Sequence, residues 1–142
     1  MRVPYETMLA EFERVLKKYG FSAERAHEAA EIFAQNSLAG VFSHGLNRFP
    51  RVVEYLRKGE IDPAAEAVCT ASFGAMERWD GQRGFGPLNA RHAIAADVAA
   101  SEPAEPGREV RCPGMGEHRS RKENMELGIP VAEEKWAEVL AM

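Results

Sequence analysis

Apolar residues recur at three- and four-residue steps through the start of this chain, and glycines divide the pattern into separate helices. Residues 5–19 carry one apolar helical face, and Gly20 ends it. Ser22 is a good N-cap for a second, alanine-rich helix to about Leu38, with Gly40 as its C-terminal stop. The small residues of this second helix allow close packing against another helix.

A third helix is predicted from about Gly45 to Arg57, with Pro50 tolerated near its first turn. His44 would lie at its start and Arg48 one turn further, on the same face. Arginine can bind a carboxylate through two parallel hydrogen bonds, and histidine can pass a proton near neutral pH. The pair could hold a 2-oxo acid and protonate its carbonyl. The spacing also fits a helix N-terminus with a partly buried histidine and a solvated arginine.

The middle of the chain predicts a β-hairpin and a fourth helix. Two strand-like runs, residues 67–73 and 76–80, flank a turn. The helix opens at the Gly-Phe-Gly-Pro run of residues 84–87, and three of its apolar residues are predicted to face inward: Leu88, Ala95 and Val98. The Gly-x-Gly lacks the third glycine and the parallel-strand context of a dinucleotide fingerprint, so we interpret it as a strand-to-helix turn.

Residues 101–107 have linker composition, with two prolines, a glycine and two acids. Beyond them we predict a short extended piece at 109–112, a polar helix over about 117–127 and a last helix over 133–140. The polar helix carries a basic cluster: His118, Arg119, Arg121 and Lys122. This cluster could receive a nucleotide phosphate, but the neighbouring acids favour a solvated helix face.

Composition excludes several classes of function. The chain has 142 residues, enough for about one domain, and its 18 Lys and Arg against 22 Asp and Glu give a net charge of −4. An acidic balance argues against nucleic-acid binding. No apolar run approaches the ~20 residues that span a bilayer, and the N-terminus lacks the apolar stretch of a signal peptide. Cys69 and Cys112 suit a reducing cytoplasm, and their surroundings predict no metal site.

Residues 40–51, Gly-Val-Phe-Ser-His-Gly-Leu-Asn-Arg-Phe-Pro-Arg, resemble the malate/L-lactate dehydrogenase family. The run from Gly74 to Gly86 supports the resemblance, which covers the first hundred residues. The Asn-Arg-Phe-Pro after Ser-His-Gly is most similar to the 2,3-diketo-L-gulonate reductase branch. In the tail, the Arg-Cys-Pro-Gly of residues 111–114, the Gly-Ile-Pro-Val of residues 128–131 and Trp136 resemble the extreme C-terminus of the same family.

The resemblance implies a division of the chain into three parts. Residues 1–100 would be the family's N-terminal lobe, 101–108 a linker where a large central cofactor domain is missing, and 109–142 the family's C-terminal segment. Family members are more than twice as long. We therefore expect an α+β fold: a mainly helical N-terminal lobe with a small β-hairpin, and a C-terminal helical segment packed back on it.

The resemblance also implies roles for individual residues. His44 would donate a proton to the substrate carbonyl, Arg48 would bind the substrate carboxylate, and Ser43 would lie beside the reacting group. A cofactor contact made by Gly-His-Glu in the reductase branch maps to three residues here: Gly114, Met115 and Gly116. Only the first is kept. The family's fold is not the Rossmann type, so a missing third glycine is expected.

The expected function is that of a cytoplasmic, homodimeric oxidoreductase. In its full-length form it would use NAD(H) or NADP(H) to reduce a 2-oxo acid resembling 2,3-diketo-L-gulonate to a 2-hydroxy acid. Without the central domain, this chain is expected to be inactive and not to bind the cofactor. The alternative is a non-catalytic dimerisation or ligand-binding module. A helix-turn-helix nucleic-acid binder has only the short helices in its favour.

Overall fold

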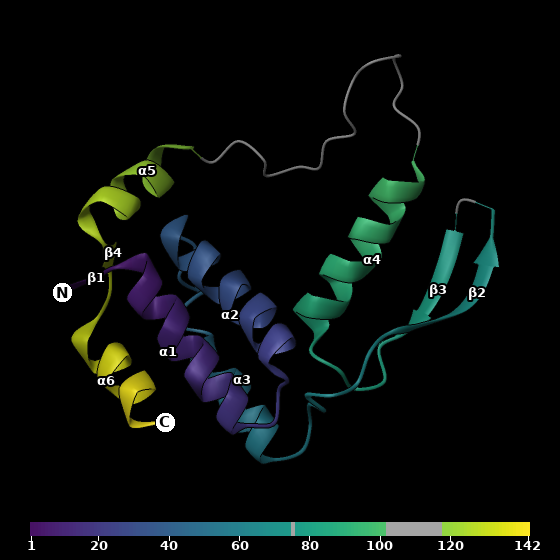
Figure 1. The fold of residues 1–142 in the computed structure, drawn as a ribbon, viewed down its shortest axis with the longest axis horizontal. Helices are drawn as coiled ribbons and strands as arrows, with labels where there is room; N and C mark the ends of the chain where they lie inside the picture. The colour runs from purple at the N-terminus through teal and green to yellow at the C-terminus, as the bar shows by residue number, and fades with distance from the viewer. Residues whose placement is uncertain (75, 102–117) are drawn as a thin grey trace.

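The computed structural model describes residues 1–74, 76–101 and 118–142, and within them the fold is mainly helical (Figure 1). In chain order the elements are β1 (Arg2–Val3), α1 (Tyr5–Lys18), α2 (Ala23–Leu38), α3 (Phe49–Arg57), β2 (Val68–Phe73), β3 (Met76–Asp80), α4 (Gly86–Ala100), α5 (His118–Leu127), β4 (Ile129–Pro130) and α6 (Glu133–Ala141). The predicted α+β class is confirmed. The predicted extended piece at 109–112, most of the linker, and Gly114, Met115 and Gly116 lie outside the described residues.

Helices α1 and α2 form as predicted and lie side by side (Figure 1). Gly20 follows α1 with a φ of +96°, a conformation that glycine adopts at little cost. The Ser22 side chain caps α2 by accepting a hydrogen bond from the Arg25 backbone N–H at 3.3 Å. Four alanines of α2 are fully buried, which lets the two helices approach closely: Ala26, Ala29, Ala30 and Ala34.

Aromatic rings join these helices to α3 and to the start of α4. The Phe12 ring of α1 stacks on the Phe49 ring of α3, with 4.2 Å between centroids. Phe33 of α2 meets Phe49 edge-on at 5.1 Å and lies 5.6 Å from Phe85, just before α4. All four rings are at most 2% exposed, so they form the centre of the core.

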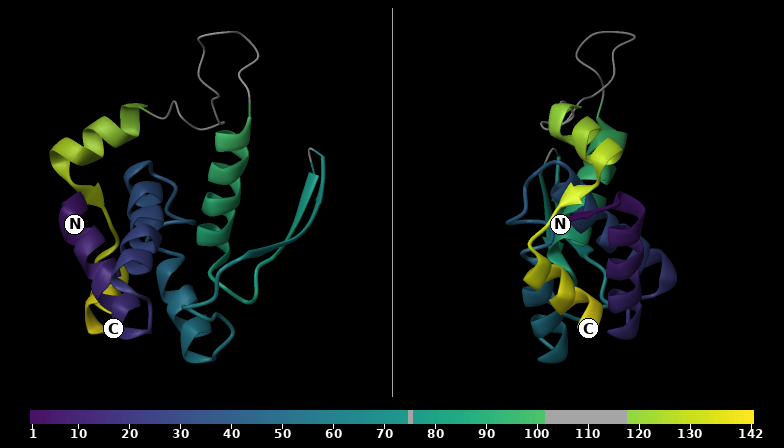
Figure 2. Two further views of the ribbon diagram at one scale, coloured as in Figure 1. Left: turned by 45° about the vertical axis from the view of Figure 1, so that its right-hand side comes forward. Right: turned by 90° about the vertical axis from the view of Figure 1, so that its left-hand side faces the viewer.

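The C-terminal segment packs back on the N-terminal lobe, as predicted. Strand β4 pairs antiparallel with β1, with Val3 opposite Ile129, a contact that the sequence analysis did not predict. Helix α6 lies against α1 and α3 and buries Trp136 and Val139 (Figure 2). The Lys18 ammonium donates a hydrogen bond to the Met142 carbonyl oxygen. The two ends of the chain therefore share one core.

The predicted hairpin forms, with β2 and β3 antiparallel and an irregularity between Cys69 and Ala71. It projects away from the helical body, and Phe73 and Met76 are 68% and 70% exposed (Figures 1 and 2). In α4, Leu88 is buried as predicted, but the inward prediction for Ala95 is wrong. Helix α4 diverges from α2 toward its C-terminal end, so Ala95 is left exposed (Figure 1).

The predicted start of the third helix is wrong. Helix α3 begins at Phe49, and residues 42–48 form consecutive turns. The Leu46 N–H donates to the Ser37 side chain, whereas in a helix it would donate to the carbonyl four residues earlier. The Asn47 N–H donates to the Phe42 carbonyl, five residues back. His44 and Arg48 therefore lie on a turn and not on one face of a helix.

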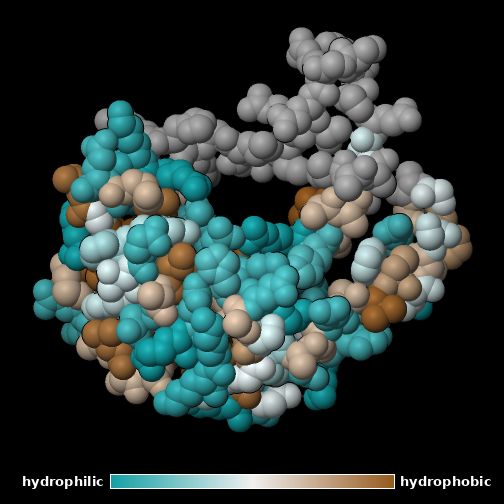
Figure 3. All heavy atoms as spheres, viewed as in Figure 1, coloured by the Kyte–Doolittle hydropathy of each residue, from teal (hydrophilic) through white to brown (hydrophobic). Residues whose placement is uncertain are grey.

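In the space-filling view most of the visible surface is hydrophilic, with scattered apolar side chains (Figure 3). Among the described helices, none is long and apolar enough to cross a membrane. The described residues also contain no group of three or more histidine, cysteine or acidic side chains that could hold a metal ion.

Candidate active site

His44 and Arg48 line one pocket of about 390 Å³. Its remaining walls come from α2, α3, Ile61 and the loop before α4, through these residues: Ile32, Phe33, Asn36, Val52, Tyr55, Ile61, Gly84, Phe85, Gly86 and Pro87. Most of this lining is apolar, while His44 and Arg48 bring a proton-carrying ring and a positive charge. A small acid with an apolar or neutral body fits this combination of groups.

The turn 42–48 brings the three predicted substrate-site residues together. Ser43 Oγ lies 3.0 Å from His44 Nδ1, within hydrogen-bond distance. Arg48 Nε donates to the Ser43 carbonyl oxygen at 3.4 Å. All three side chains are exposed. With Nδ1 held by Ser43, the Nε2 atom of His44 remains for another partner, as do the terminal nitrogens of Arg48.

The position of this turn depends on its contact with the end of α2. A Cβ at Gly45 would lie 2.2 Å from Ser37 Oγ and 2.8 Å from Ser37 N. Only a residue without a side chain allows two backbones to approach this closely. The glycine of Ser-His-Gly is therefore required by packing, and it places His44 directly beside the last turn of α2.

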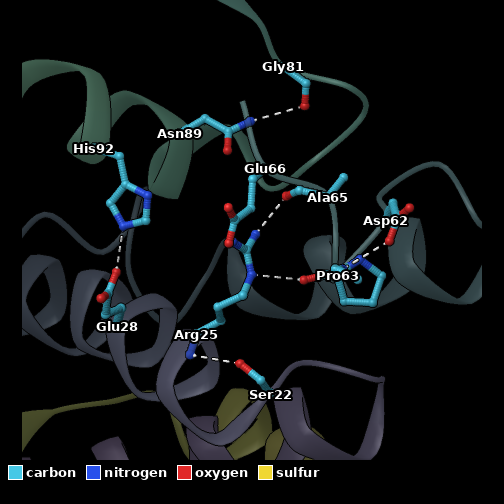
Figure 4. Close-up of polar contacts among 11 residues, drawn as sticks. Ser22, Arg25, Glu28, Asp62, Pro63, Ala65, Glu66, Gly81, Asn89 and His92 are labelled. Atoms are coloured by element: carbon cyan, nitrogen blue, oxygen red, sulfur yellow. Dashed lines mark hydrogen bonds and ion pairs between the residues drawn. The ribbon is translucent and has the colours of Figure 1, made fainter. Parts of the chain in front are cut away.

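The opposite wall, around residues 81–87, is held by α2 through a neighbouring loop (Figure 4). Arg25 donates to the Pro63 carbonyl oxygen at 3.1 Å and to the Ala65 carbonyl oxygen at 2.7 Å. The Asp62 N–H in turn donates to the Arg83 carbonyl oxygen at 2.9 Å. Through these bonds, the loop that contains Phe85 is attached to the N-terminal end of α2.

Helix α4 contacts α2 through two exposed side-chain pairs. His92 Nε2 lies 2.8 Å from a Glu28 carboxylate oxygen (Figure 4), and Arg91 donates to Glu31 at 2.8 Å. Exposed pairs of this kind contribute little to the free energy of folding.

A second, largely apolar groove of about 730 Å³ runs between α2 and α4. It shares Ile32, Asn36 and Pro87 with the His44 pocket, so the two spaces adjoin. Arg121 of α5 lines its far end. Burial, followed by the charge of Glu31, raises the pKa of Tyr5, whose hydroxyl therefore stays neutral and accepts a hydrogen bond from Gln35 beside this groove.

The basic cluster predicted on α5 is described only in part. Arg121 and Lys122 are exposed, and Arg121 also lines the groove between α2 and α4. The side chains of His118 and Arg119 lie outside the described residues. The solvated helix face that the sequence favours for this cluster, over a phosphate contact, stays a prediction.

The first glycine of the Gly-x-Gly run packs closely against the rest of the chain. A Cβ at Gly84 would lie 2.7 Å from the Ala65 carbonyl oxygen and 3.1 Å from the Asn89 side-chain nitrogen. The space beside Gly84 is thus filled by the chain itself, in keeping with the predicted strand-to-helix turn.

Sequence reasoning missed two polar residues that line the pocket, Asn36 and Tyr55, and the buried Ser37 beside the turn. The sequence did not indicate that Asn36 and Tyr55 line the pocket, because a polar residue on a helix is normally interpreted as solvent-exposed. Ser37 is buried although it lies near a helix end, where serine is usually exposed. Its pairing with Gly45 could be found only once the two backbones were known to touch.

Comparison with known proteins places this geometry in a family. The sequence profile described as malate/L-lactate dehydrogenase matches residues 3–99. The 2,3-diketo-L-gulonate reductase of Escherichia fergusonii is 46% identical over 102 residues, covering 70% of this chain and 31% of the relative. This chain therefore spans about a third of the length of the relatives it matches.

Solved structures of the same kind match the fold. Malate dehydrogenase from Pyrococcus horikoshii aligns with a TM-score of 0.66 at 25% identity, covering 70% of this chain and 28% of that chain. Sulfolactate dehydrogenase from Methanocaldococcus jannaschii aligns with a TM-score of 0.66 at 29% identity, covering 70% and 29%. With a family profile over two thirds of its length, this chain belongs to the malate/L-lactate dehydrogenase family.

Proposed function

We propose that this chain carries the substrate-binding and proton-donating part of an NADH- or NADPH-dependent oxidoreductase that reduces a 2-oxo acid to a 2-hydroxy acid. The observation that supports it is that His44 and Arg48 line the same apolar-walled pocket. The similarity to 2,3-diketo-L-gulonate reductases makes 2,3-diketo-L-gulonate the first substrate to test.

In this proposal Arg48 binds the substrate carboxylate. Its Nε contacts the Ser43 carbonyl oxygen, so both terminal nitrogens remain to form parallel hydrogen bonds with two carboxylate oxygens. Binding through two bonds fixes the plane of the acid and turns its 2-oxo group toward His44. Orientation of this kind supplies much of the rate enhancement in a two-partner reaction.

His44 then supplies the proton. NADH or NADPH, when bound, supplies the hydride that adds to the carbonyl carbon. Negative charge develops on the carbonyl oxygen, and protonated His44 gives its Nε2 proton to that oxygen. The product is the 2-hydroxy acid, and His44 is left neutral with Nδ1 still beside Ser43 Oγ. Ser43 holds the ring in the orientation that the transfer needs.

The chain alone is proposed not to turn over. The proposed arrangement is an N-terminal lobe over residues 1–100, a linker over 101–108 and a C-terminal family segment over 109–142. The packing of β4 on β1 and of α6 on α1 supports this arrangement, since the ends of a discontinuous domain must meet. The rest of the relatives' length would carry most of the cofactor surface.

A second candidate is a non-catalytic module that forms a homodimer. The exposed apolar residues of the hairpin favour it, with Val68, Phe73 and Met76 between 47% and 70% exposed. Apolar surface gathered on one projecting element is typical of a contact with another protein surface.

Titration of the folded chain with NADH, followed by nicotinamide fluorescence, tests the proposed inactivity of this chain and the role of His44. The measurement is repeated with 2,3-diketo-L-gulonate present and with the His44→Ala variant. We expect no saturable NADH binding and no NADH oxidation by this chain alone. If the wild-type chain oxidises NADH and His44→Ala does not, a usable cofactor site exists and the proposal that this chain is inactive is wrong. Turnover that His44→Ala leaves unchanged would overturn the assignment of the proton donor.

A further inference from the structure

Two polar side chains are buried in the core of the described residues, and both act at the C-terminal end of α2. Ser37 is 0% exposed and Asn124 is 6% exposed. The Ser37 hydroxyl bonds to the turn 42–48, and the Asn124 side-chain nitrogen donates to the Leu38 carbonyl oxygen. Burying a polar group costs free energy unless it is hydrogen-bonded, so each bond fixes the geometry of the backbone it joins.

The Ser37 hydroxyl is engaged on both sides. It donates to the Phe33 carbonyl oxygen one turn earlier in α2, at 2.8 Å. It accepts from the Leu46 N–H at 2.9 Å. Leu46 is itself 1% exposed, so water cannot replace Ser37 Oγ unless the turn lifts away from α2.

Gly45 adds a second contact to the same serine. Its missing Cβ would fall 2.2 Å from Ser37 Oγ, so the turn lies directly on the last turn of α2. Ser37 thus touches the two residues between His44 and Asn47. Asn36, which directly precedes Ser37, and Ile32, one turn before Asn36, form a wall of the His44 pocket.

We propose that Ser37 is a positioning residue for the active-site turn. Its hydroxyl holds the Leu46 N–H so that His44 and Arg48 present their side chains to one pocket. The proposal rests on the proposed function in that this pocket receives a 2-oxo acid. Ser37 acts through Gly45 and Leu46 and does not itself line the pocket. A displacement of about 1 Å in a binding group can cost about a hundredfold in rate, so the effect should be measurable.

Ser37→Ala is the test, and Asn124→Ala is its matched control. Asn124→Ala removes one buried hydrogen bond at the end of α2 and Ser37→Ala removes two, but only Ser37 contacts the turn. Nuclear magnetic resonance of the full chain reads the backbone shifts of residues 43–48 and the ring shifts of His44. Titration with oxamate, an isostere of a simple 2-oxo acid, reads the binding affinity. Ser37→Cys, with a weaker acceptor, replaces Ser37→Ala if the latter does not fold.

Ser37→Ala should shift the His44 ring and the turn amides and weaken oxamate binding about tenfold or more. Ser37→Cys should have an intermediate effect, and Asn124→Ala should leave both readouts near wild type. Equal changes in Ser37→Ala and Asn124→Ala would overturn the positioning role, since both would then act only through stability. If the wild-type chain does not bind oxamate, the proposed function fails at this pocket. The His44 and turn shifts then still decide whether Ser37 positions the turn.

Discussion

Replacing Trp136 with alanine should destabilise the whole chain, because α6 is part of the shared core. Trp136 is 7% exposed and packs where α6 meets α1 and α3. Truncating a buried tryptophan typically costs about 3–5 kcal/mol, from lost burial and the cavity left behind. Domains of this kind are stable by about 5–15 kcal/mol, so about a fifth or more of the stability would be lost.

Leu140 provides the control, since it lies on the same helix but is 50% exposed. Leu140→Ala should cost about 1 kcal/mol or less. Urea unfolding followed by far-ultraviolet circular dichroism gives both values without relying on tryptophan fluorescence. If Trp136→Ala and Leu140→Ala have the same midpoint, the C-terminal helix does not pack on the N-terminal lobe and the fold described above is refuted.

Three further substitutions test separate contacts by urea unfolding. Gly45→Ala should destabilise by about 1–3 kcal/mol, because its Cβ would overlap Ser37 Oγ, and an unchanged midpoint would refute the close approach. Arg25→Ala should cost about 1.5–3 kcal/mol, since it removes bonds from a charged group to two carbonyl oxygens; a loss no larger than that of an exposed arginine would contradict this. Hydrogen bonds from Lys17, and second from His27, lower the pKa of the Glu13 carboxyl group below its ordinary value of 4.5. The ionised Glu13 therefore stabilises the folded chain above pH 4.5, and this contribution is lost as the pH falls through the pKa of Glu13 in the folded state. Glu13→Gln should therefore reduce the loss of unfolding free energy at acid pH by less than about 1 kcal/mol. An unchanged dependence of the unfolding free energy on pH would contradict the hydrogen bonds of Glu13 to Lys17 and His27.

Local pattern was enough to predict most of the fold. The glycine stops, the Ser22 cap and the alanine-rich face of α2 are short-range signals, and the helices follow them within a residue or two. The pairing of β1 with β4 joins residues more than 120 positions apart through two-residue strands, which leave no periodicity to detect. The inward prediction for Ala95 failed because the direction of α4 depends on what packs beside it.

The sequence suggested the residue types of the candidate site but not their geometry. Ser43, His44 and Arg48 were identified from the sequence, yet they lie on a turn and not on one helical face. The turn depends on a side-chain bond from Ser37, nine residues before Leu46, which competes with the helical bond. Tertiary contacts of this kind override local propensity, so periodicity alone extended the helix too far.

The most direct test of the proposed site is binding of a 2-oxo acid isostere by the wild-type chain and by Arg48→Ala, followed by residue-resolved nuclear magnetic resonance. The proposed site predicts saturable oxamate shifts at three separate segments at once, around Asn36, residues 43–48 and residues 84–87, with one dissociation constant. Arg48→Ala should weaken binding about tenfold to a hundredfold, as expected for loss of a charged hydrogen-bonding partner. Saturable shifts at these segments that persist unchanged in Arg48→Ala, or shifts confined to another surface, would contradict the proposed site.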